Sequence, residues 1–170
     1  MPKFTTDLMR RSFLGKLILG SSALALAGKA SAAGNESQPA AEDELKFPGE
    51  EAAHKVVYQF NKADEHYHKA VLFSVGAMLR KYGDNVKIVV TCFGPGIHIL
   101  AKHPKRPVSK ETREKVSSLA LYGVEFHACG NTMTALKWTK KDMLDFATVV
   151  DVGAADLMEL QEKGFAYLSW

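Results

Sequence analysis

The chain has 170 residues, with 22 Lys or Arg, 19 Asp or Glu, two Cys and a formal net charge of +3. Residues 1–32 hold five of the basic residues and one acidic residue, so the remainder carries a net charge of −1. A nearly neutral domain gives no electrostatic basis for binding nucleic acid or an anionic membrane. Two cysteines are also too few for a disulfide scaffold.

Residues 1–32 have the pattern of an export signal. Arg10-Arg11-Ser12-Phe13-Leu14 is a paired-arginine motif, and an apolar run over residues 17–27 follows it. Small residues of the A-x-A type come next, so we predict a twin-arginine signal peptide cleaved near Ala32 or Ala33. The apolar run is shorter than the about 20 residues of a membrane helix. We therefore expect a periplasmic protein with no stable membrane span after cleavage, and an uncleaved anchor is the alternative.

Residues 33–52 are small, polar and acidic, which predicts a flexible linker. The predicted domain occupies residues 53–170. A segment of this length has room for one hydrophobic core and not for two.

Strands and helices are predicted to alternate along the domain. Runs rich in apolar and β-branched residues predict strands at residues 55–61, 86–93, 124–129, 148–152 and 165–168. Helical periodicity or helix-capping residues lie between them, at residues 71–82, 97–101, 109–123, 139–146 and 154–163. This alternation requires right-handed crossovers, and so predicts a three-layer α/β/α fold with a five-stranded parallel sheet. The order of the strands does not follow from it.

The carboxyl ends of the first three strands are expected to share one edge of the sheet, where α/β proteins bind ligands. The segments at these ends are residues 61–68, 92–98 and 129–133. Five of the six histidines lie in or beside them: His66, His68, His98, His103 and His127. This concentration favours a functional site at this edge.

Cys129 is the main candidate in that edge. It ends a predicted strand, and Gly130-Asn131 after it marks a turn into a helical segment that begins near Thr132. Free N–H groups at such a turn stabilise a thiolate and lower the pKa of the thiol. The alternative is a small buried hydrophobic residue, since cysteines are often buried.

The other cysteine and two histidines have structural interpretations. Cys92 lies within an apolar strand, so we expect it to be buried. A disulfide between Cys92 and Cys129 requires neighbouring strands with Cα atoms within about 7 Å. His66 and His68, at a helix start, are expected to be a solvated pair.

Metal and anion binding are weaker alternatives. His127 shares a strand face with Cys129, and His98 or His66 are further ligand candidates, but the chain has no H-E-x-x-H or C-x-x-C motif. We therefore predict no metal and no cofactor. Glycine N–H groups of the Gly94-Pro95-Gly96 turn can bind an anion, although a tight turn explains them equally well. The candidate ligand-binding residues are Gly94, Gly96, Gly130, Asn131 and Thr132.

The segment Gly123-Val124-Glu125-Phe126-His127-Ala128-Cys129-Gly130-Asn131-Thr132 resembles the DsrE/DsrF-like family of small sulfur-relay proteins. The Gly94-Pro95-Gly96 turn and the tail from Asp151 to Tyr167 fit the same pattern. The resemblance implies a five-stranded parallel three-layer fold, trimers or hexamers, and a thiol that carries sulfur as a persulfide, here Cys129. Cytoplasmic sulfur-transfer members have an alanine- and arginine-rich segment after the cysteine, which this chain lacks.

The leading hypothesis is a periplasmic sulfur-handling protein. Cys129 accepts sulfane sulfur from a donor and passes it to an acceptor, either of which is a protein or a small molecule, with help from His127 or from N–H groups of residues 130–132. This hypothesis expects an exposed sulfur atom. The alternatives are a metal- or small-ligand-binding module that uses His127 and Cys129, and an oligomeric scaffold in which Cys129 is simply buried.

Overall fold

The computed structural model describes residues 51–170. The predicted signal peptide (1–32) and nearly all of the predicted linker (33–52) lie outside the described residues. Within residues 51–170, no helix has the length and apolar character needed to cross a membrane.

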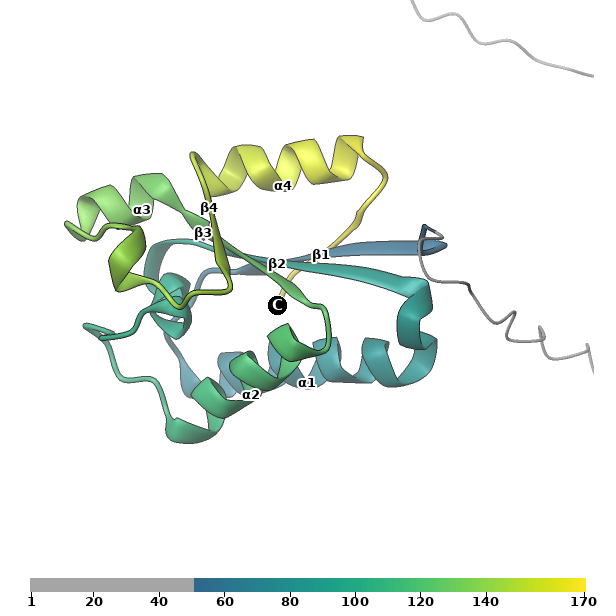
Figure 1. Cartoon of the computed structure of the whole chain (residues 1–170), viewed down its shortest axis with the longest axis horizontal. Coiled ribbons are helices and arrows are strands. Elements are labelled where there is room, and N and C mark those ends of the chain that lie inside the picture. The colour runs from purple at the N-terminus through teal and green to yellow at the C-terminus, as the bar shows by residue number, and fades with distance from the viewer. Residues whose placement is uncertain (1–50) are drawn as a thin grey trace, which may run out of the picture. The chain divides into compact units, whose positions relative to one another are not determined.

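A sheet of five parallel strands forms the centre of the domain, as predicted (Figure 1). The strands are β1 (His54–Phe60), β2 (Val86–Cys92), β3 (Glu125–Cys129), β4 (Ala147–Val150) and β5 (Ala166–Leu168), in the order β4-β3-β2-β1-β5. Six of the seven β2 residues are buried, because this strand has a neighbour on each side and helices over both faces. The sheet places the carboxyl ends of β1, β2 and β3 side by side.

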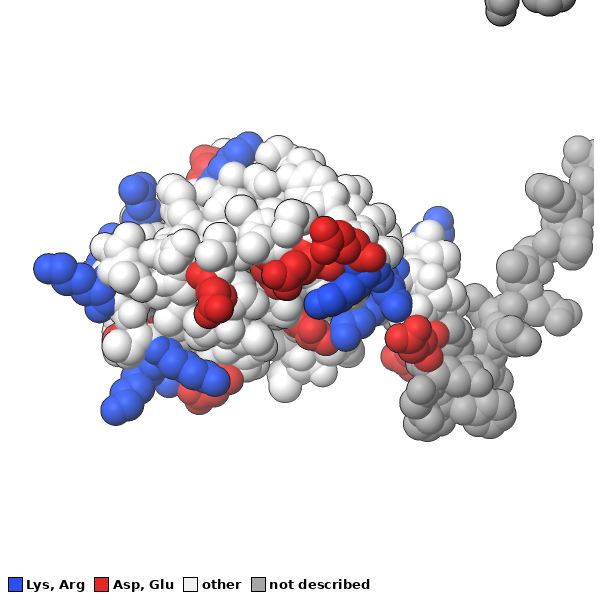
Figure 2. Space-filling model, turned by 90° about the horizontal axis from the view of Figure 1, so that it is seen from above, with Lys and Arg blue, Asp and Glu red and all other residues white. Residues whose placement is uncertain are grey.

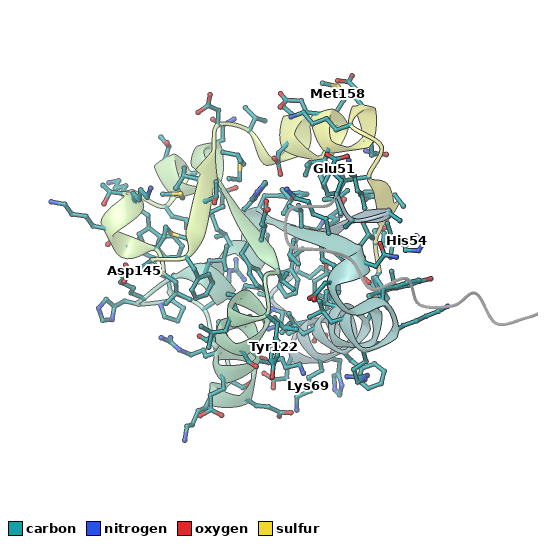
Figure 3. The ribbon with its side chains drawn as sticks, turned by 45° about the vertical axis from the view of Figure 1, so that its right-hand side comes forward. Glu51, His54, Lys69, Tyr122, Asp145 and Met158 are labelled. Carbon is teal, nitrogen blue, oxygen red and sulfur yellow. The ribbon has the colours of Figure 1, made fainter. Side chains whose placement is uncertain are left out.

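Helices cover the two faces of the sheet unequally. The helices α1 (Glu65–Tyr82) and α2 (Lys110–Leu121) lie on one face, and α4 (Gly153–Glu162) lies on the other (Figure 1). Tyr122, after α2, and Met158, on α4, accordingly lie on opposite sides of the molecule (Figure 3). The short helix α3 (Gly130–Ala135) begins where β3 ends.

The hydrophobic core is divided in the same way. A large cluster fills the α1 and α2 face, and includes Phe60, Val90 and Phe126 from the strands. The α4 face holds a small cluster of five buried residues, which are Val57, Val89, Leu157, Leu160 and Phe165. Because side chains alternate along a strand, β1 and β2 each send residues to both clusters. The α4 face is therefore the less apolar of the two.

Two predicted helices are shorter or tighter in the structure. The predicted helix at 97–101 belongs to a 3-10 segment, η2 (Gly94–Leu100), and the one at 139–146 is reduced to η3 (Lys140–Asp142). A third 3-10 turn, η1 (Gly83–Asn85), joins α1 to β2. The capping box at Thr139 and Asp142 is present, because the Asp142 carboxylate accepts hydrogen bonds from the Thr139 N–H and hydroxyl.

Candidate functional site

Cys129 lies at the junction of three elements. It is the last residue of β3 and the N-cap residue of α3, and its Sγ accepts a hydrogen bond from the N–H of Gly153 at 3.2 Å. Gly153 is the first residue of α4, and Val152 before it provides no side-chain cap. The sulfur thus accepts a hydrogen bond from one of the N–H groups that have no partner within the first turn of a helix.

Thr132 links the thiol to the turn that follows β2. Its Oγ1 accepts a hydrogen bond from the N–H of Gly94 at 3.0 Å, so its own proton is available for the sulfur of Cys129. Among the predicted ligand-binding residues, the structure therefore brings Gly94, Asn131 and Thr132 together with the thiol, directly or through one hydrogen bond.

The surroundings of Cys129 favour its thiolate. Burial alone raises the pKa of the thiol, but hydrogen bonds outweigh burial and hold the pKa below its ordinary value. The donors are the Thr132 hydroxyl and the N–H groups of Gly153 and Thr132, and the N–H of Asn131, which donates to the carbonyl oxygen of Asp151 at 3.1 Å, adds a smaller effect. A larger fraction of this thiol is therefore ionised at neutral pH than of a free cysteine, and the thiolate is the nucleophile.

The sulfur is less accessible than the sequence predicts. Cys129 is 5% exposed, so the expectation of an openly exposed sulfur is wrong. The reason is that α4 begins directly against the end of β3, and the backbone of Gly153 covers the thiol. Asn131 and Val152, which lie in the two turns that meet at the sulfur, are exposed. Cys129 therefore lies among polar backbone groups close to the surface rather than deep in hydrocarbon.

Position 153 leaves little room for a side chain. A Cβ atom there would lie 3.1 Å from Cys129 Cβ and 3.2 Å from Phe93 Cβ, which is closer than such atoms normally approach. Position 130 is similar, since a Cβ there would lie 3.1 Å from the carbonyl oxygen of Val150. Gly130 therefore allows α3 to start beside β4, and Gly153 allows α4 to start beside the thiol.

The turn after β2 has no free glycine N–H groups. The N–H of Gly94 donates to Thr132, and that of Gly96 donates to the carbonyl oxygen of Phe93 at 3.1 Å. A Cβ at Gly96 would lie only 2.3 Å from the carbonyl oxygen of Phe60, so close packing explains this glycine. These contacts favour the tight-turn role of Gly94 and Gly96 over anion binding.

His127 does not assist the thiol in the way that the sequence predicts. Its Nδ1 lies 2.9 Å from both carboxylate oxygens of Asp156, and its Nε2 lies 3.7 Å from Glu125 Oε2. Among the described residues, no hydrogen bond joins His127 to Cys129. Both side chains face α4, but the imidazole is committed to Asp156.

Asp156 is a residue that the sequence reasoning missed. Its Oδ2 also accepts a hydrogen bond from the Thr91 hydroxyl at 2.6 Å, and all three members of this polar cluster, Thr91, His127 and Asp156, are buried. Burial raises the pKa of Asp156, but the hydrogen bonds from His127 and Thr91 outweigh burial and hold the pKa below its ordinary value. A signal for a polar partner was available, because Thr91 and His127 lie on adjacent strands and point to the same face of the sheet.

Cys92 is buried, as predicted. It lies on the face of the sheet opposite to Cys129. It pairs in register with Ala128, so Cys129 is displaced by one residue and points to the other side. Both cysteines are free, and the predicted alternative of a disulfide is therefore wrong. The apolar surroundings raise the pKa of Cys92 well above its ordinary value.

His66 and His68 do not join the site, whereas His98 lines a hollow of about 200 Å³ together with Gly94 and Thr132. His66 is exposed, but His68 is only 1% exposed, so the prediction of a solvated pair is wrong for His68. His68 stacks on Phe60, and its Nε2 lies 3.0 Å from the carbonyl oxygen of Lys62. Within residues 51–170, no group of three or more His, Cys, Asp or Glu side chains is arranged to hold a metal ion. The described part of the chain thus gives the metal-binding alternative no ligand set.

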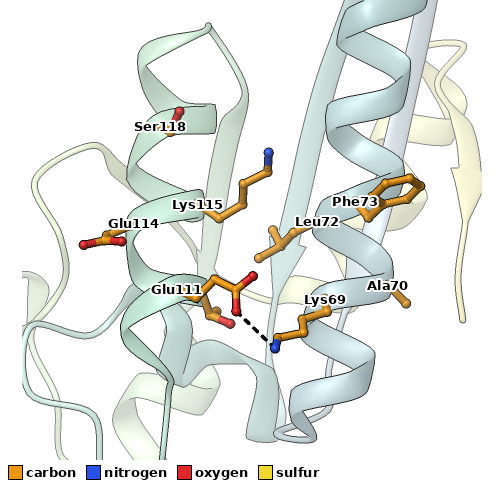
Figure 4. Close-up of a pocket in the computed structure, with 9 residues that line it drawn as sticks. Lys69, Ala70, Leu72, Phe73, Glu111, Glu114, Lys115 and Ser118 are labelled. Atoms are coloured by element: carbon orange, nitrogen blue, oxygen red, sulfur yellow. Dashed lines mark ion pairs between the residues drawn. The ribbon is translucent and has the colours of Figure 1, made fainter.

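Hollows elsewhere on the surface do not contain the thiol. A groove of about 700 Å³ lies between α1 and α2, and includes Leu72, Phe73 and the ion pair of Lys69 with Glu111 (Figure 4). It lies on the side of the sheet away from α4.

On the α4 side, Figure 2 shows acidic and basic side chains next to one another and no continuous basic surface. The charged side chains on this face are therefore mixed in sign.

The fold and site define a class of protein, an α/β domain with a hydrogen-bonded thiol at the carboxyl edge of a parallel sheet. Residues 48–170 match the model of the DsrE/DsrF-like family, and the chain belongs to this family. Membership supports a sulfur-relay role in general terms. The resemblance seen in the sequence is thus confirmed at the level of the family.

Solved structures share the fold. A protein of unknown function from Methanobacterium thermoautotrophicum is 26% identical, with a TM-score of 0.62 over 69% of this chain and 99% of that one. The ychN protein from E. coli is 13% identical, with a TM-score of 0.55 over 69% and 99% of the two chains. A conserved protein of unknown function from Bacteroides thetaiotaomicron is 13% identical, with a TM-score of 0.50 over 68% and 94%. A search of curated proteins finds no match.

Proposed function

We propose that the protein is a periplasmic sulfur carrier in which Cys129 accepts sulfane sulfur and passes it on as a persulfide. The observation that carries this proposal is the set of hydrogen-bond donors around one thiol, which holds its pKa below the ordinary value. The other thiol of the domain, Cys92, is fully buried, donates only to the carbonyl oxygen of Val90 at 3.7 Å, and has a raised pKa. Cys129 is therefore the thiol suited to nucleophilic attack.

The transfer consists of two displacements at sulfur. The Cys129 thiolate attacks the outer sulfur of a persulfide or of thiosulfate, a new S–S bond forms, and the donor's S–S bond breaks. The electron pair of the broken bond leaves with the donor as a thiolate or as sulfite, so no external oxidant or reductant is needed. An acceptor thiolate then attacks the outer sulfur of the Cys129 persulfide and regenerates the Cys129 thiolate.

The same N–H groups that stabilise the thiolate also suit the persulfide. Gly153 presents a backbone donor, and the Thr132 hydroxyl presents a side-chain donor, to whichever sulfur carries the negative charge. Low exposure of Cys129 shields the persulfide from solvent. The contacts around the thiol therefore match both the resting state and the loaded state.

Location, partners and assembly are further parts of the proposal. The periplasmic location rests on the paired-arginine leader and its A-x-A-type cleavage region in residues 1–32. The partners are a sulfur donor and a sulfur acceptor, each a protein or a small molecule. A trimer or hexamer is the assembly that the family resemblance implies.

Intact mass spectrometry tests the sulfur chemistry. The purified protein is incubated with thiosulfate or polysulfide and weighed before and after treatment with cyanide, which removes sulfane sulfur. The wild type and the Cys92→Ala variant should both gain one sulfur atom and lose it to cyanide. Cys129→Ser should gain none. An equal gain on Cys129→Ser, or no gain on the wild type with any donor, would reject the proposal.

A further inference from the structure

The start of α4 is held near the thiol by backbone and polar contacts. Just before it, Val150 pairs in register with Cys129, and the carbonyl oxygen of Asp151 accepts a hydrogen bond from the N–H of Asn131 at 3.1 Å. The apolar contacts of this helix belong to the small cluster of Leu157, Leu160 and Phe165 against two valines of the sheet. Leu157 and Leu160 lie beyond the first turn of α4, and Phe165 lies after the helix. The first turn itself is joined to the sheet by the polar cluster of Thr91, His127 and Asp156.

Asp156 and the donor to the thiol belong to the same helical turn. Gly153 is the first residue of α4, and the N–H of Asp156 donates to the carbonyl oxygen of Val152 at 3.0 Å, which closes this turn. A shift of the Asp156 side chain relative to the sheet therefore moves Gly153 relative to Cys129 as well. Since hydrogen bonds weaken steeply with poor distance and angle, a small shift is enough to lose the 3.2 Å contact.

Both sides of the polar cluster are firmly placed. Thr91 and His127 are paired in register on the adjacent strands β2 and β3, and Thr91 is 0% exposed. The Asp156 carboxylate accepts hydrogen bonds from both, at 2.6 and 2.9 Å. A carboxylate that bridges two strands in this way fixes the helix turn in position along the sheet as well as in distance from it.

We infer that Asp156 is a positioning residue for the thiol, which holds the first turn of α4 on β2 and β3 through Thr91 and His127, and so keeps the Gly153 N–H on Cys129. This inference rests on the proposed function only in taking Cys129 as the reacting thiol. Asp156 itself does not touch the sulfur or any reacting atom.

Positioning and charge predict opposite effects of removing Asp156. A negative charge near the thiol disfavours the thiolate. If Asp156 acted only through its charge, its removal would therefore lower the pKa of the thiol. Loss of the Gly153 hydrogen bond raises it. The other charged groups near the cluster are Glu125, which pairs with Lys87 at 3.1 Å, and Lys163 on α4, and these remain in every variant. The sign of the pKa change therefore separates the two explanations.

The test is a titration of the full chain in a Cys92→Ala background, so that Cys129 is the one thiol that ionises. Thiolate absorbance against pH is compared among the parent, Asp156→Ala, Asp156→Asn and Thr91→Val, with circular dichroism as the check on folding. Asp156→Ala should raise the pKa and slow alkylation by iodoacetamide at neutral pH by roughly 3- to 10-fold. Asp156→Asn keeps one acceptor oxygen and should show a smaller rise, and Thr91→Val the smallest.

The inference is overturned if folded Asp156→Ala has an unchanged or lowered thiol pKa. Should Asp156→Ala not fold, the two milder variants decide the question, and an unchanged pKa in both overturns it. The titration is independent of sulfur transfer. If the wild type fails to take up sulfane sulfur while the variants raise the thiol pKa, the proposed function is rejected and the positioning role stands.

Discussion

The two faces of the sheet give two neighbouring cysteines opposite chemistry. Cys92 and Cys129 lie on adjacent strands and are 0% and 5% exposed, but Cys92 lies deep in the core and Cys129 lies close to the surface. Cys92 faces the large apolar cluster, and burial raises its pKa well above the ordinary value. Cys129 faces the first turn of α4, where backbone and hydroxyl donors lower its pKa. The two thiols therefore differ both in depth of burial and in nearby hydrogen-bond donors, and their pKa values shift in opposite directions.

The faces also differ in how they stabilise the domain. The α1 and α2 face contains most of the buried apolar side chains, whereas the α4 face combines five apolar residues with the buried polar cluster. Buried apolar area stabilises folding in proportion to its size, while a buried polar cluster contributes mainly by fixing geometry. We therefore assign stability mainly to the first face and the tuning of the thiol to the second.

Matched Leu→Ala substitutions test this division through the free energy of unfolding. Leu119 on α2 packs in the large cluster and Leu160 on α4 packs in the small one. Leu119→Ala should destabilise the protein by about 3–5 kcal/mol and Leu160→Ala by about 2–3 kcal/mol, because the smaller cluster can close more easily around the lost side chain. Denaturant unfolding curves measure both. A larger loss from Leu160→Ala would contradict the division between the faces.

Gly153→Ala should affect the thiol more than the fold. The added Cβ would lie 3.1 Å from Cys129 Cβ, so the start of α4 must move and the 3.2 Å hydrogen bond to the sulfur weakens. We expect the pKa of Cys129 to rise and alkylation at neutral pH to slow by roughly 3- to 10-fold. Ala154→Gly is the matched control, because Ala154 is exposed in the same turn and its replacement costs about 1 kcal/mol of helix stability without touching the thiol. Equal alkylation rates in Gly153→Ala and wild type would show that this contact does not tune the thiol.

Local sequence patterns predicted the fold class and the position of Cys129. Alternating strands and helices require a parallel three-layer fold whatever the strand order, and Gly130-Asn131 marks the turn after Cys129. His68 shows where a local signal was available but not used. It precedes Val71, Leu72 and Val75 at helical spacing, which places it on the buried face of α1.

The long-range part of the site was not predictable in this way. The contacts of Gly153 and Asp156 join α4 to β2 and β3, across 24 residues for the hydrogen bond to Cys129 and 65 for the bond to Thr91. They depend on the strand order and on where α4 crosses the sheet, and no local pattern specifies either. The contact of His127 with Asp156 was not foreseen for the same reason, since Asp156 arrives from a distant helix.

Titration of the Cys129 thiolate tests the central claim most directly. In the Cys92→Ala variant, the thiolate absorbance of the folded protein should rise at a lower pH than that of the same variant unfolded in denaturant. Because the folded-state pKa is the lower one, the folded protein should also gain stability relative to Cys129→Ser as pH rises through the folded-state pKa, and lose this gain as pH falls through it. A midpoint at or above that of the unfolded variant would contradict the account.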